Sequence, residues 1–391
     1  MTGKERVLRI IAHKEADRIP KYDAFWEDTL INWHATGLPY DPVEKYEILT
    51  LESGTKIIGN TVGDYFGFDI DMFYLDNSMR FTPIILEDHE TYSIISDRCG
   101  YTVKRFKNKG ATMHFINHVN PDRTSWEKIK SKFVPDMSDT SRIDHESFFL
   151  RTSRIPSWSE TKIIFDKYRK RDKFLLLNGY GPFEGTWRHH GYTSSLVDML
   201  CDKNLMKEMF ESITHLTLET IKHAIDMGMK PDGYFMIEDL GYTHSTLFSP
   251  DLYKEVLWPY HKMLGDFLHR EGIYFFIHSC GKIDTLLPYF IDAGVDVVQP
   301  LQANTGMDVR DLKRMYKKDL TFWGNINEIE LSKSFEDIER EIAGKVTEAM
   351  KDGGYIYHSD HSIPPTVSFE NYRYVMKMLD KYGKYDVFND T

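Results

Sequence analysis

The sequence pairs a histidine with a cysteine at the end of an apolar run, in the tetrapeptide His278-Ser279-Cys280-Gly281. The run before it, residues 273–277, has the length and composition of a short buried β-strand. Because side chains alternate along a strand, His278 and Cys280 project from the same side of it. An imidazole and a thiolate side by side are two of the usual ligands of zinc. The pair therefore predicts part of a metal site.

A second group of polar residues follows the strand-like stretch 354–357 and contains His358, Asp360 and His361. We expect His361 to be the third metal ligand, and three protein ligands with an open fourth position would make the site catalytic. Asp360 would orient His361 or cap the turn that follows. His358 would be a ligand, a substrate contact or a surface residue. The alternative for the first pair is a buried cysteine beside a hydrogen-bonded histidine, without metal.

Two further candidate segments also follow predicted strands. Glu238 and Asp239 are adjacent, so only one of them should face a pocket. A carboxylate there would orient the substrate, act as an acid or base, or be a further metal ligand, and we expect Glu238 in the catalytic role; the alternative is a helix cap or an ion pair. The glycine-rich stretch 178–187 lacks the Gly-Lys-Ser/Thr ending of a phosphate loop. It supplies Glu184 as a second catalytic candidate. The side chains that we expect to contact the substrate are Trp26, Asn178, Tyr180, Phe183, Trp187 and His358.

Composition and charge exclude several classes of protein. The 391 residues are 41% hydrophobic, which suffices for one large domain, and we predict a single domain over residues 1–391. Lys plus Arg is 49 and Asp plus Glu is 60, so the net charge is −11, which argues against nucleic acid and anionic membranes as main partners. Three cysteines, no long apolar run and no signal-peptide core predict a cytoplasmic protein.

From residue 160 onward, apolar strands alternate with amphipathic helices. Repeated units of this kind indicate a parallel sheet, and their number favours a (β/α)8 TIM barrel, an α/β fold, over a doubly wound sheet. Barrel active sites lie where the strands end, and each polar cluster described above is in such a place. The predicted strands are 174–178, 233–237, 273–277, 295–299, 320–324 and 354–357.

The first 160 residues are less regular. We predict an N-terminal helical segment followed by a first barrel strand, and a region of inserted β-hairpins broken by turn signals. The predicted segments are a helix at 3–14, a strand at 19–26, a helix at 41–53, a β-rich insertion at 66–120, and helices at 125–135 and 144–155.

These motifs, in this order, resemble the uroporphyrinogen decarboxylase superfamily over nearly the whole chain. The resemblance implies a TIM barrel, and a homodimer because the superfamily often dimerises. The segments that carry it are Asp17-Arg18-Ile19-Pro20, Ser249-Pro250-Asp251-Leu252-Tyr253, Phe276-Ile277-His278-Ser279-Cys280-Gly281, Trp323-Gly324-Asn325-Ile326 and His361-Ser362-Ile363-Pro364-Pro365.

Within the superfamily, the sequence departs from the decarboxylases. Those enzymes have an Arg-Gln-Ala-Gly-Arg stretch after the first strand, which supplies arginines for a substrate with many carboxylates. Residues 23–28 here are acidic and aromatic instead. The His-x-Cys pair resembles the zinc methyltransferases of the superfamily, which work with corrinoid proteins. In the thiol-methylating members the third ligand is a later cysteine, whereas His361 stands at that place here.

The expected ligand set favours oxygen chemistry over sulfur chemistry. One thiolate and two imidazoles, from Cys280, His278 and His361, leave zinc a stronger Lewis acid than two thiolates do. The resemblance therefore implies a zinc-dependent methyltransferase of the O-demethylase type. Such an enzyme moves a methyl group from a small donor, a methoxylated aromatic in our first hypothesis, to the cob(I)alamin of a separate corrinoid-binding protein.

Three alternatives stay open. The first is a methylcorrinoid:thiol methyltransferase on the same fold, and the second is a uroporphyrinogen decarboxylase. The third is a barrel that binds a corrinoid partner or a small ligand without turnover. The chain shows no Asp-x-His-x-x-Gly corrinoid motif, so in the methyltransferase hypotheses the corrinoid (cobalamin) belongs to a partner protein.

Overall fold

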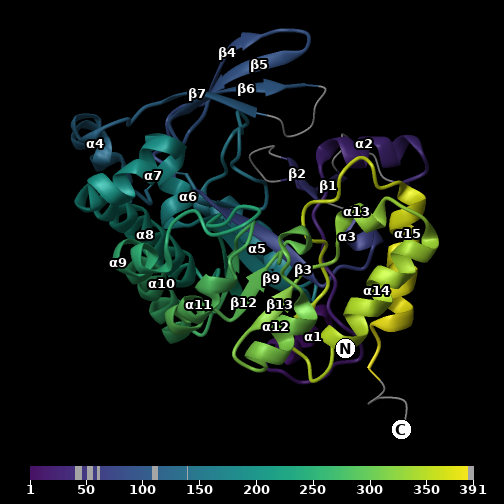
Figure 1. Ribbon diagram of the computed structural model, residues 1–391. Helices are drawn as coiled ribbons and strands as arrows, with labels where there is room; N and C mark the ends of the chain where they lie inside the picture. Colours follow the sequence, from purple (N-terminus) through teal and green to yellow (C-terminus); the bar gives the residue numbers. More distant parts are fainter. Residues whose placement is uncertain (40–45, 51–55, 60–61, 108–112, 139, 386–391) are drawn as a thin grey trace.

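A central sheet of eight strands organises the molecule (Figure 1). Seven strands run parallel, in the order β14-β13-β12-β11-β10-β9-β3, and β8 pairs antiparallel with β3 at one end. The strands are β3 (Ile70–Leu75), β8 (Ile143–Asp144), β9 (Phe174–Tyr180), β10 (Gly233–Ile237), β11 (Tyr274–His278), β12 (Val297–Gln299), β13 (Thr321–Trp323) and β14 (Tyr355–Ile356). This computed structural model describes the chain except residues 40–45, 51–55, 60–61, 108–112, 139 and 386–391.

The segment around Lys21 connects the two ends of the parallel sheet. Lys21 forms a parallel bridge with Tyr357, which directly follows β14. On its other side, the Lys21 carbonyl accepts the N–H of Asp69, just before β3, at 2.9 Å. The seven parallel strands and this segment make eight, the number of a (β/α)8 barrel. The predicted fold class is confirmed. At the place of the predicted first strand, residues 19–26, the structure forms isolated parallel bridges at Lys21 and Phe25 and no continuous strand.

Helices surround the sheet (Figure 1). They alternate with the strands from β9 onward, as the sequence rhythm predicts. No described helix is long and apolar enough to cross a membrane. The helices are α1 (Gly3–Ile11), α2 (Glu27–Ala35), α3 (Val62–Tyr65), α4 (Arg123–Ile129), α5 (Trp158–Arg169), α6 (Pro182–His190), α7 (Tyr192–Cys201), α8 (Lys203–Asp226), α9 (Pro250–Val256), α10 (Trp258–Arg270), α11 (Leu287–Ala293), α12 (Val309–Tyr316), α13 (Glu328–Leu331), α14 (Phe335–Ala349) and α15 (Phe369–Tyr382), with 3-10 turns at Lys130–Phe133, Asp284–Leu286 and Ala303–Thr305.

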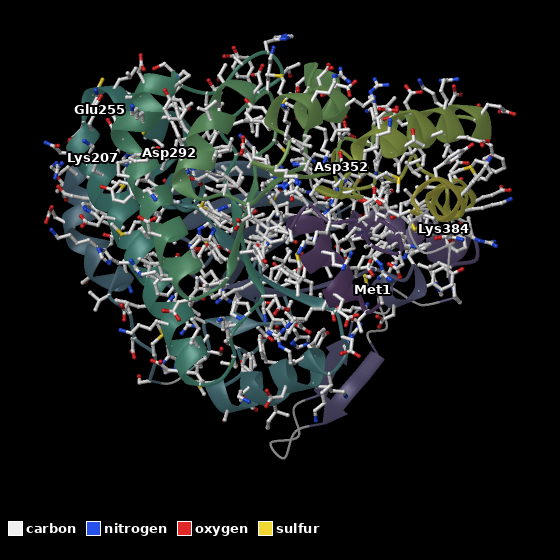
Figure 2. All side chains as sticks on the ribbon, turned by 90° about the horizontal axis from the view of Figure 1, so that it is seen from below. Met1, Lys207, Glu255, Asp292, Asp352 and Lys384 are labelled. Carbon is white, nitrogen blue, oxygen red and sulfur yellow. The ribbon has the colours of Figure 1, made fainter. Side chains whose placement is uncertain are left out.

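The two ends of the described chain meet on one side of the barrel. Figure 2 labels Met1 and Lys384 on the same side of the molecule. The Met1 ammonium lies 3.7 Å from a carboxylate oxygen of Asp17, and the neighbouring Arg18 forms an antiparallel bridge with Lys384. The same view shows side chains filling the space between helices and sheet, which is the packed core that continuous apolar strands predict.

A small antiparallel sheet stands off the barrel above α6 and α7 (Figure 1). It consists of β4 (Ile84–Asp88), β5 (Tyr92–Ser96), β6 (Tyr101–Phe106) and β7 (Met113–His118), paired in that order. These hairpins fall within the region that we predicted as an insertion. β3, at the start of that region, belongs to the barrel instead. The apolar pattern of β3 is interrupted by Asp71, whose carboxylate pairs with Arg171 at 3.2 Å.

Three local predictions need correction. Part of the predicted helix 41–53 is a strand, β1 (Tyr46–Thr50), paired antiparallel with β2 (Lys56–Gly59). The predicted helix 144–155 is irregular after β8. Arg151 turns back there to donate to Asp144 at 2.6 Å, so a side-chain contact replaces the helical ladder. The glycine-rich stretch after β9 contains helix α6, which the glycines concealed.

Candidate metal centre and adjacent cavity

The strand register explains which side chains meet at the end of the barrel. Ile237 of β10 is paired with His278 of β11, which is paired in turn with Gln299 of β12. Paired residues on neighbouring parallel strands point to the same face. Asp239 and Cys280, each two residues beyond the pair Ile237 and His278, therefore lie side by side. The register thus selects Asp239, and not Glu238, to join the histidine and the cysteine.

Asp239, His278 and Cys280 form a compact group of potential metal ligands. One ligand atom from each lies within 4.8 Å of the others. The His278 Nε2 atom lies 3.4 Å from Cys280 Sγ and 3.4 Å from Asp239 Oδ1. Asp239 Oδ1 also accepts the backbone N–H of Cys280 at 2.8 Å, which fixes the carboxylate beside the thiol. Imidazole, thiolate and carboxylate are all ligands that zinc accepts.

The charges in this group favour the binding of a cation. Burial by itself disfavours the charged ring of His278, yet the neighbouring Cys280 and Asp239 raise its pKa well above the ordinary value. For Asp239, burial opposes ionisation, but contact with His278 and the N–H of Cys280 lowers its pKa. The side chains of Asp239 and His278 are 43% and 20% exposed. The group therefore offers a bound cation both negative charge and an open side.

A chain of hydrogen bonds fixes the ring of His278. Its Nδ1 atom contacts Oε1 of Gln299, and Nε2 of Gln299 contacts Nε2 of His358 at 3.2 Å. The Nδ1 atom of His358 in turn contacts the carbonyl oxygen of Ser359. Since carbonyl oxygens only accept, both histidines carry their proton on Nδ1 in this arrangement. His278 Nε2 is then the ring nitrogen that faces Cys280 and Asp239, and it would bind a metal by giving up its proton.

His361, which we predicted as the third ligand, does not belong to this group. Among the described residues, the carboxylate of Asp239 completes the cluster instead. The ring of His361 stacks on Trp26, with centroids 5.7 Å apart. Asp360 does not orient it, because its two oxygens accept the N–H groups of Ala303 at 3.0 Å and Glu328 at 2.9 Å. Asp360 thus ties neighbouring strand ends together.

Glu238 faces away from the cluster and is fully buried. Its two oxygens accept the N–H groups of Phe183 and Glu184, at 2.9 and 2.8 Å, in the first turn of α6. Nε2 of His261 lies 3.0 Å from one of them. Every contact of this carboxylate is structural, so the expectation that Glu238 orients a substrate is corrected. The structure shows the alternative that we gave for this residue, a helix cap.

Glu184 lies at the start of α6 and is nearly fully buried. It accepts hydrogen bonds from Nε1 of Trp187 at 2.9 Å and from Arg188 at 2.6 Å. Burial, together with the negative charges of Asp239 and Glu238, raises its pKa to about 7 against the opposing effect of Arg188. A carboxyl group with such a pKa can hold or release a proton near neutral pH. Its catalytic role remains a prediction.

A cavity of about 180 Å³ opens at the ends of β3, β9 and β10. Asn178, Tyr180 and Ile237 form part of its wall, and Ile237 precedes Asp239 by two residues. The Arg188 guanidinium lies 4.0 Å above the Tyr180 ring, behind this wall. Of the predicted substrate contacts, Asn178 and Tyr180 therefore line the cavity.

The other predicted substrate contacts lie elsewhere. Phe183 is fully buried and packs edge-on against Phe248, with ring centroids 5.4 Å apart. Trp187 contacts Phe115 of the small sheet edge-on at 5.2 Å, and Trp26 stacks on His361. His358 is buried and contacts Gln299, which in turn holds His278.

Sequence reasoning chose Glu238 over Asp239, gave Gln299 no role and missed most of the cavity lining. Asp239 was within reach, because the alternation of side chains allowed only one of Glu238 and Asp239 to face the pocket. The choice between them needs the β10–β11 register, which the sequence does not give. Gln299 follows a predicted strand, but only its pairing with His278 reveals its role. The cavity combines segments that are far apart in the chain.

Comparisons with known proteins identify the family. The family model for uroporphyrinogen decarboxylase (URO-D) matches residues 184–382, slightly more than half of the chain. The uroporphyrinogen decarboxylase of Aquifex aeolicus (strain VF5) is 26% identical over 187 residues, 46% of this chain and 49% of that protein, so the match spans about half of its length. The structure of a methyltransferase from Methanosarcina mazei has a TM-score of 0.66, covering 98% of this chain and 99% of that one, and its 14% identity makes this a likeness of fold. The chain therefore belongs to the uroporphyrinogen decarboxylase family.

Proposed function

We propose that this protein transfers a methyl group from a methoxylated aromatic compound to the cob(I)alamin of a separate corrinoid protein. The observation that carries the proposal is the group of Asp239, His278 and Cys280 at the ends of the barrel strands, within 4.8 Å of one another. In a TIM barrel this is where active sites lie. The proposed corrinoid partner, the substrate and zinc are inferences from this donor set and from the family.

The three side chains suit zinc by their chemistry and their surroundings. Gln299 holds Nδ1 of His278, so Nε2 would be the nitrogen that binds zinc in place of a proton, and Asp239 and Cys280 would supply anionic ligands. A carboxylate is a harder and weaker electron donor than a second thiolate. Zinc bound by this set would supply Lewis acidity, which stabilises negative charge that develops on an oxygen leaving group.

The proposed reaction breaks the bond between the methyl carbon and the ether oxygen. The oxygen leaves with the bonding electrons and takes up a proton, so the methoxyarene becomes a phenol. Cobalt(I) of the partner supplies the electron pair for the new carbon–cobalt bond and becomes cobalt(III). In this chain, Asn178 and Tyr180 would bind the ring at the cavity wall. Glu184, with its pKa of about 7, is our candidate for holding a proton near the site.

Decarboxylation of a porphyrinogen receives less support. Residues 19–28, at the place of the predicted first strand and its loop, contain no arginine. A tetrapyrrole with many carboxylates requires cationic partners, because a buried anion is costly without them. Thiol methylation stays as a second candidate, since Asp239 and Cys280 would give zinc two anionic ligands, as two thiolates do.

The test is a methyl-transfer assay without oxygen. Untagged protein is mixed with chemically reduced cob(I)alamin and 3-methoxybenzoate, while absorbance follows cob(I)alamin and chromatography follows 3-hydroxybenzoate. We expect equal amounts of methylcobalamin and phenol, and stoichiometric zinc in the protein. Cys280→Ala should lose both zinc and turnover, whereas Cys201→Ala, at an exposed cysteine of α7, should keep both. Unchanged turnover in Cys280→Ala, or methyl transfer only from methylcobalamin to thiols, would contradict the proposal.

A further inference from the structure

A buried arginine of α6 forms an ion pair with the carboxyl group that we propose as a proton holder. Arg188 is 8% exposed, and one of its terminal nitrogens donates to Oε1 of Glu184 at 2.6 Å. Among the described residues this is its one ion pair, and its buried Nε atom has no hydrogen-bond partner there. A guanidinium is not deprotonated in proteins. Arg188 therefore places a permanent positive charge against this carboxyl group.

Aromatic rings and a backbone contact hold the guanidinium in place. Its central carbon lies 4.0 Å from the centre of the Tyr180 ring and 4.7 Å from that of Trp187. Cation–π contacts of this kind gain strength where water is excluded. The backbone carbonyl of Arg188 accepts a hydrogen bond from Nδ1 of His118, at the end of β7, at 3.0 Å. These contacts fix the positive charge beside Glu184.

The other charged side chains around Glu184 are acidic. Glu238 accepts the backbone N–H of Glu184 at 2.8 Å. The negative charges of Glu238 and Asp239 act with burial to raise the pKa of Glu184, whereas Arg188 lowers it. The titratable groups that face Glu184 are Arg188 of α6, Tyr180 of β9, Glu238 and Asp239 after β10, Tyr192 of α7 and Cys280 after β11. Of these groups, Arg188 is the cation.

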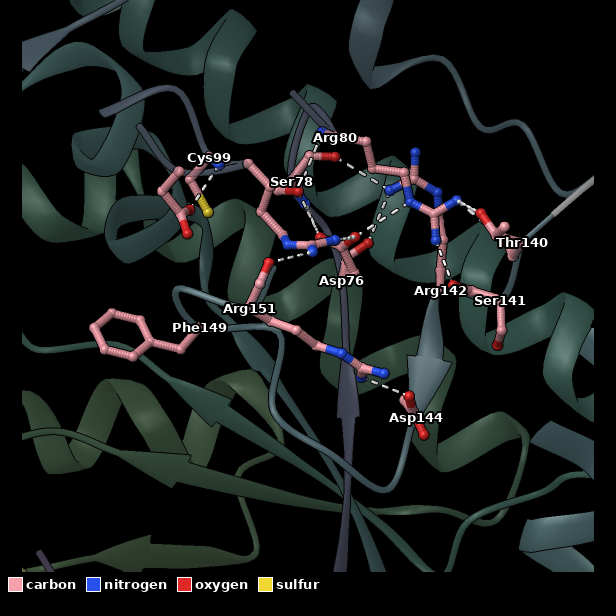
Figure 3. Close-up of polar contacts among 12 residues, drawn as sticks. Asp76, Ser78, Arg80, Cys99, Thr140, Ser141, Arg142, Asp144, Phe149 and Arg151 are labelled. Carbon is pink, nitrogen blue, oxygen red and sulfur yellow. Dashed lines mark hydrogen bonds and ion pairs between the residues drawn. The ribbon is translucent and has the colours of Figure 1, made fainter. Parts of the chain in front are cut away.

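Other arginines near the cavity have partners of their own. Figure 3 shows the side chains of Arg80 and Arg142 gathered around Asp76. Nε of Arg80 lies 3.2 Å from the Asp76 carboxylate, and Arg142 donates to the Asp76 backbone carbonyl at 2.8 Å. Their charges are engaged at Asp76. The charge of Glu184 therefore depends on Arg188.

We propose that Arg188 is a positioning residue that decides whether Glu184 holds or releases its proton. A buried carboxylate without a cation is costly, so without the guanidinium Glu184 would keep its proton to a higher pH. The use of this proton on the leaving phenol oxygen rests on the proposed function, whereas the pairing with Arg188 does not. Arg188 would thus regulate the proton supply of the proposed reaction.

The test follows the carboxyl carbon of Glu184 by NMR in the whole protein with isotope-labelled glutamate, assigned through Glu184→Gln. We expect a titration midpoint at about pH 7. Arg188→Met should raise it by about one to two pH units, because a hydrogen bond to a charged group is lost. Arg188→Lys keeps a cation and should stay closer to the unmodified protein. Arg310→Met, at an arginine of α12 paired with Asp308, should leave the midpoint unchanged.

A midpoint that does not move in Arg188→Met would overturn the inference. A merely structural role would lower the stability of this variant to urea and leave the titration of Glu184 where it was. If Arg188→Met does not fold, the guanidinium nitrogens of the unmodified protein give the answer. Their NMR signals should shift with the same midpoint as Glu184, and this shift should vanish in Glu184→Gln. Guanidinium signals that show no such shift would refute the inference.

The inference and the proposed function fail separately. With 3-methoxybenzoate, phenol formation should fall as the pH rises through the midpoint of Glu184, and Arg188→Met should move this fall to higher pH. Normal NMR titrations without any demethylation would refute the proposed function alone. Demethylation with an unmoved midpoint in Arg188→Met would refute the inference alone.

Discussion

The histidine that we propose as a metal ligand depends on a neighbour that is not itself a ligand. Gln299 holds His278 through Oε1 and His358 through Nε2. We predict that Gln299→Leu lowers zinc affinity about 10- to 100-fold, because partners of this kind contribute that much at metal sites. Gln299→Glu should retain most of the affinity, since its oxygen still accepts the His278 proton. Competition with a chromophoric chelator measures both variants, and an unchanged affinity in Gln299→Leu would exclude the positioning role.

Single residues show where sequence reasoning about the site succeeds and where it stops. His278 and Cys280 lie on one strand, so a local rule, the alternation of side chains, brings them together. The third member of the group comes from another strand, where only the register decides. We predicted His361 because it follows another predicted strand, but β14 is separated from β11 by two strands and the ring of His361 stacks on Trp26. Contacts between strands thus need information that one sequence pattern lacks.

At the scale of elements, the beginning of α6 depends on Glu238. Glu238→Gln would place a donor against one of the N–H groups of Phe183 and Glu184. We expect it to lower the free energy of unfolding by about 2–4 kcal/mol, because a buried charged acceptor is lost at a helix N-terminus. Urea denaturation measures the change. Glu211→Gln, at an exposed position on α8, is the control. A stable but inactive Glu238→Gln would instead indicate a chemical role.

Some elements could be predicted from the sequence and others could not. The strands from β9 to β14 were predictable because each is an apolar run that is buried on both faces. Helix α6 was hidden by Gly181 and Gly185, which lower helix propensity but are needed for close packing. A Cβ on Gly181 would lie 2.3 Å from Oε2 of Glu238, and one on Gly185 would lie 3.0 Å from Ile213. Tertiary contacts therefore selected residues that local propensity disfavours.

For the whole molecule, the proposed chemistry and the proposed recognition come from different parts of the chain. The family match covers residues 184–382, which include Asp239, His278 and Cys280. The cavity lining comes almost entirely from residues 74–180, before that match begins. Barrels commonly vary their ligands through loops while the strands hold the reacting groups. The cavity is thus the part of the molecule on which we expect the identity of the substrate to depend.

The closed barrel depends on contacts between the segment 19–26 and its last elements. Asp23 is buried and accepts hydrogen bonds from the hydroxyls of Tyr357 and Tyr372, both at 2.9 Å, and of Ser359. We predict that Asp23→Ala lowers the free energy of unfolding by about 3–5 kcal/mol, because three buried donors lose their acceptor. Urea denaturation followed by tryptophan fluorescence measures the change.

Tyr374→Phe provides a matched control for this prediction. It removes a hydroxyl of α15 that donates to Glu339 at 3.1 Å in a half-buried position, and should cost about 1 kcal/mol, because a single hydrogen bond contributes little. An Asp23→Ala protein as stable as this control would show that the contacts of Asp23 do not hold the barrel closed. A large loss of stability in Asp23→Ala would show that one buried carboxylate is needed to close the barrel. The strand ends that carry the proposed metal site would then depend on it for their position.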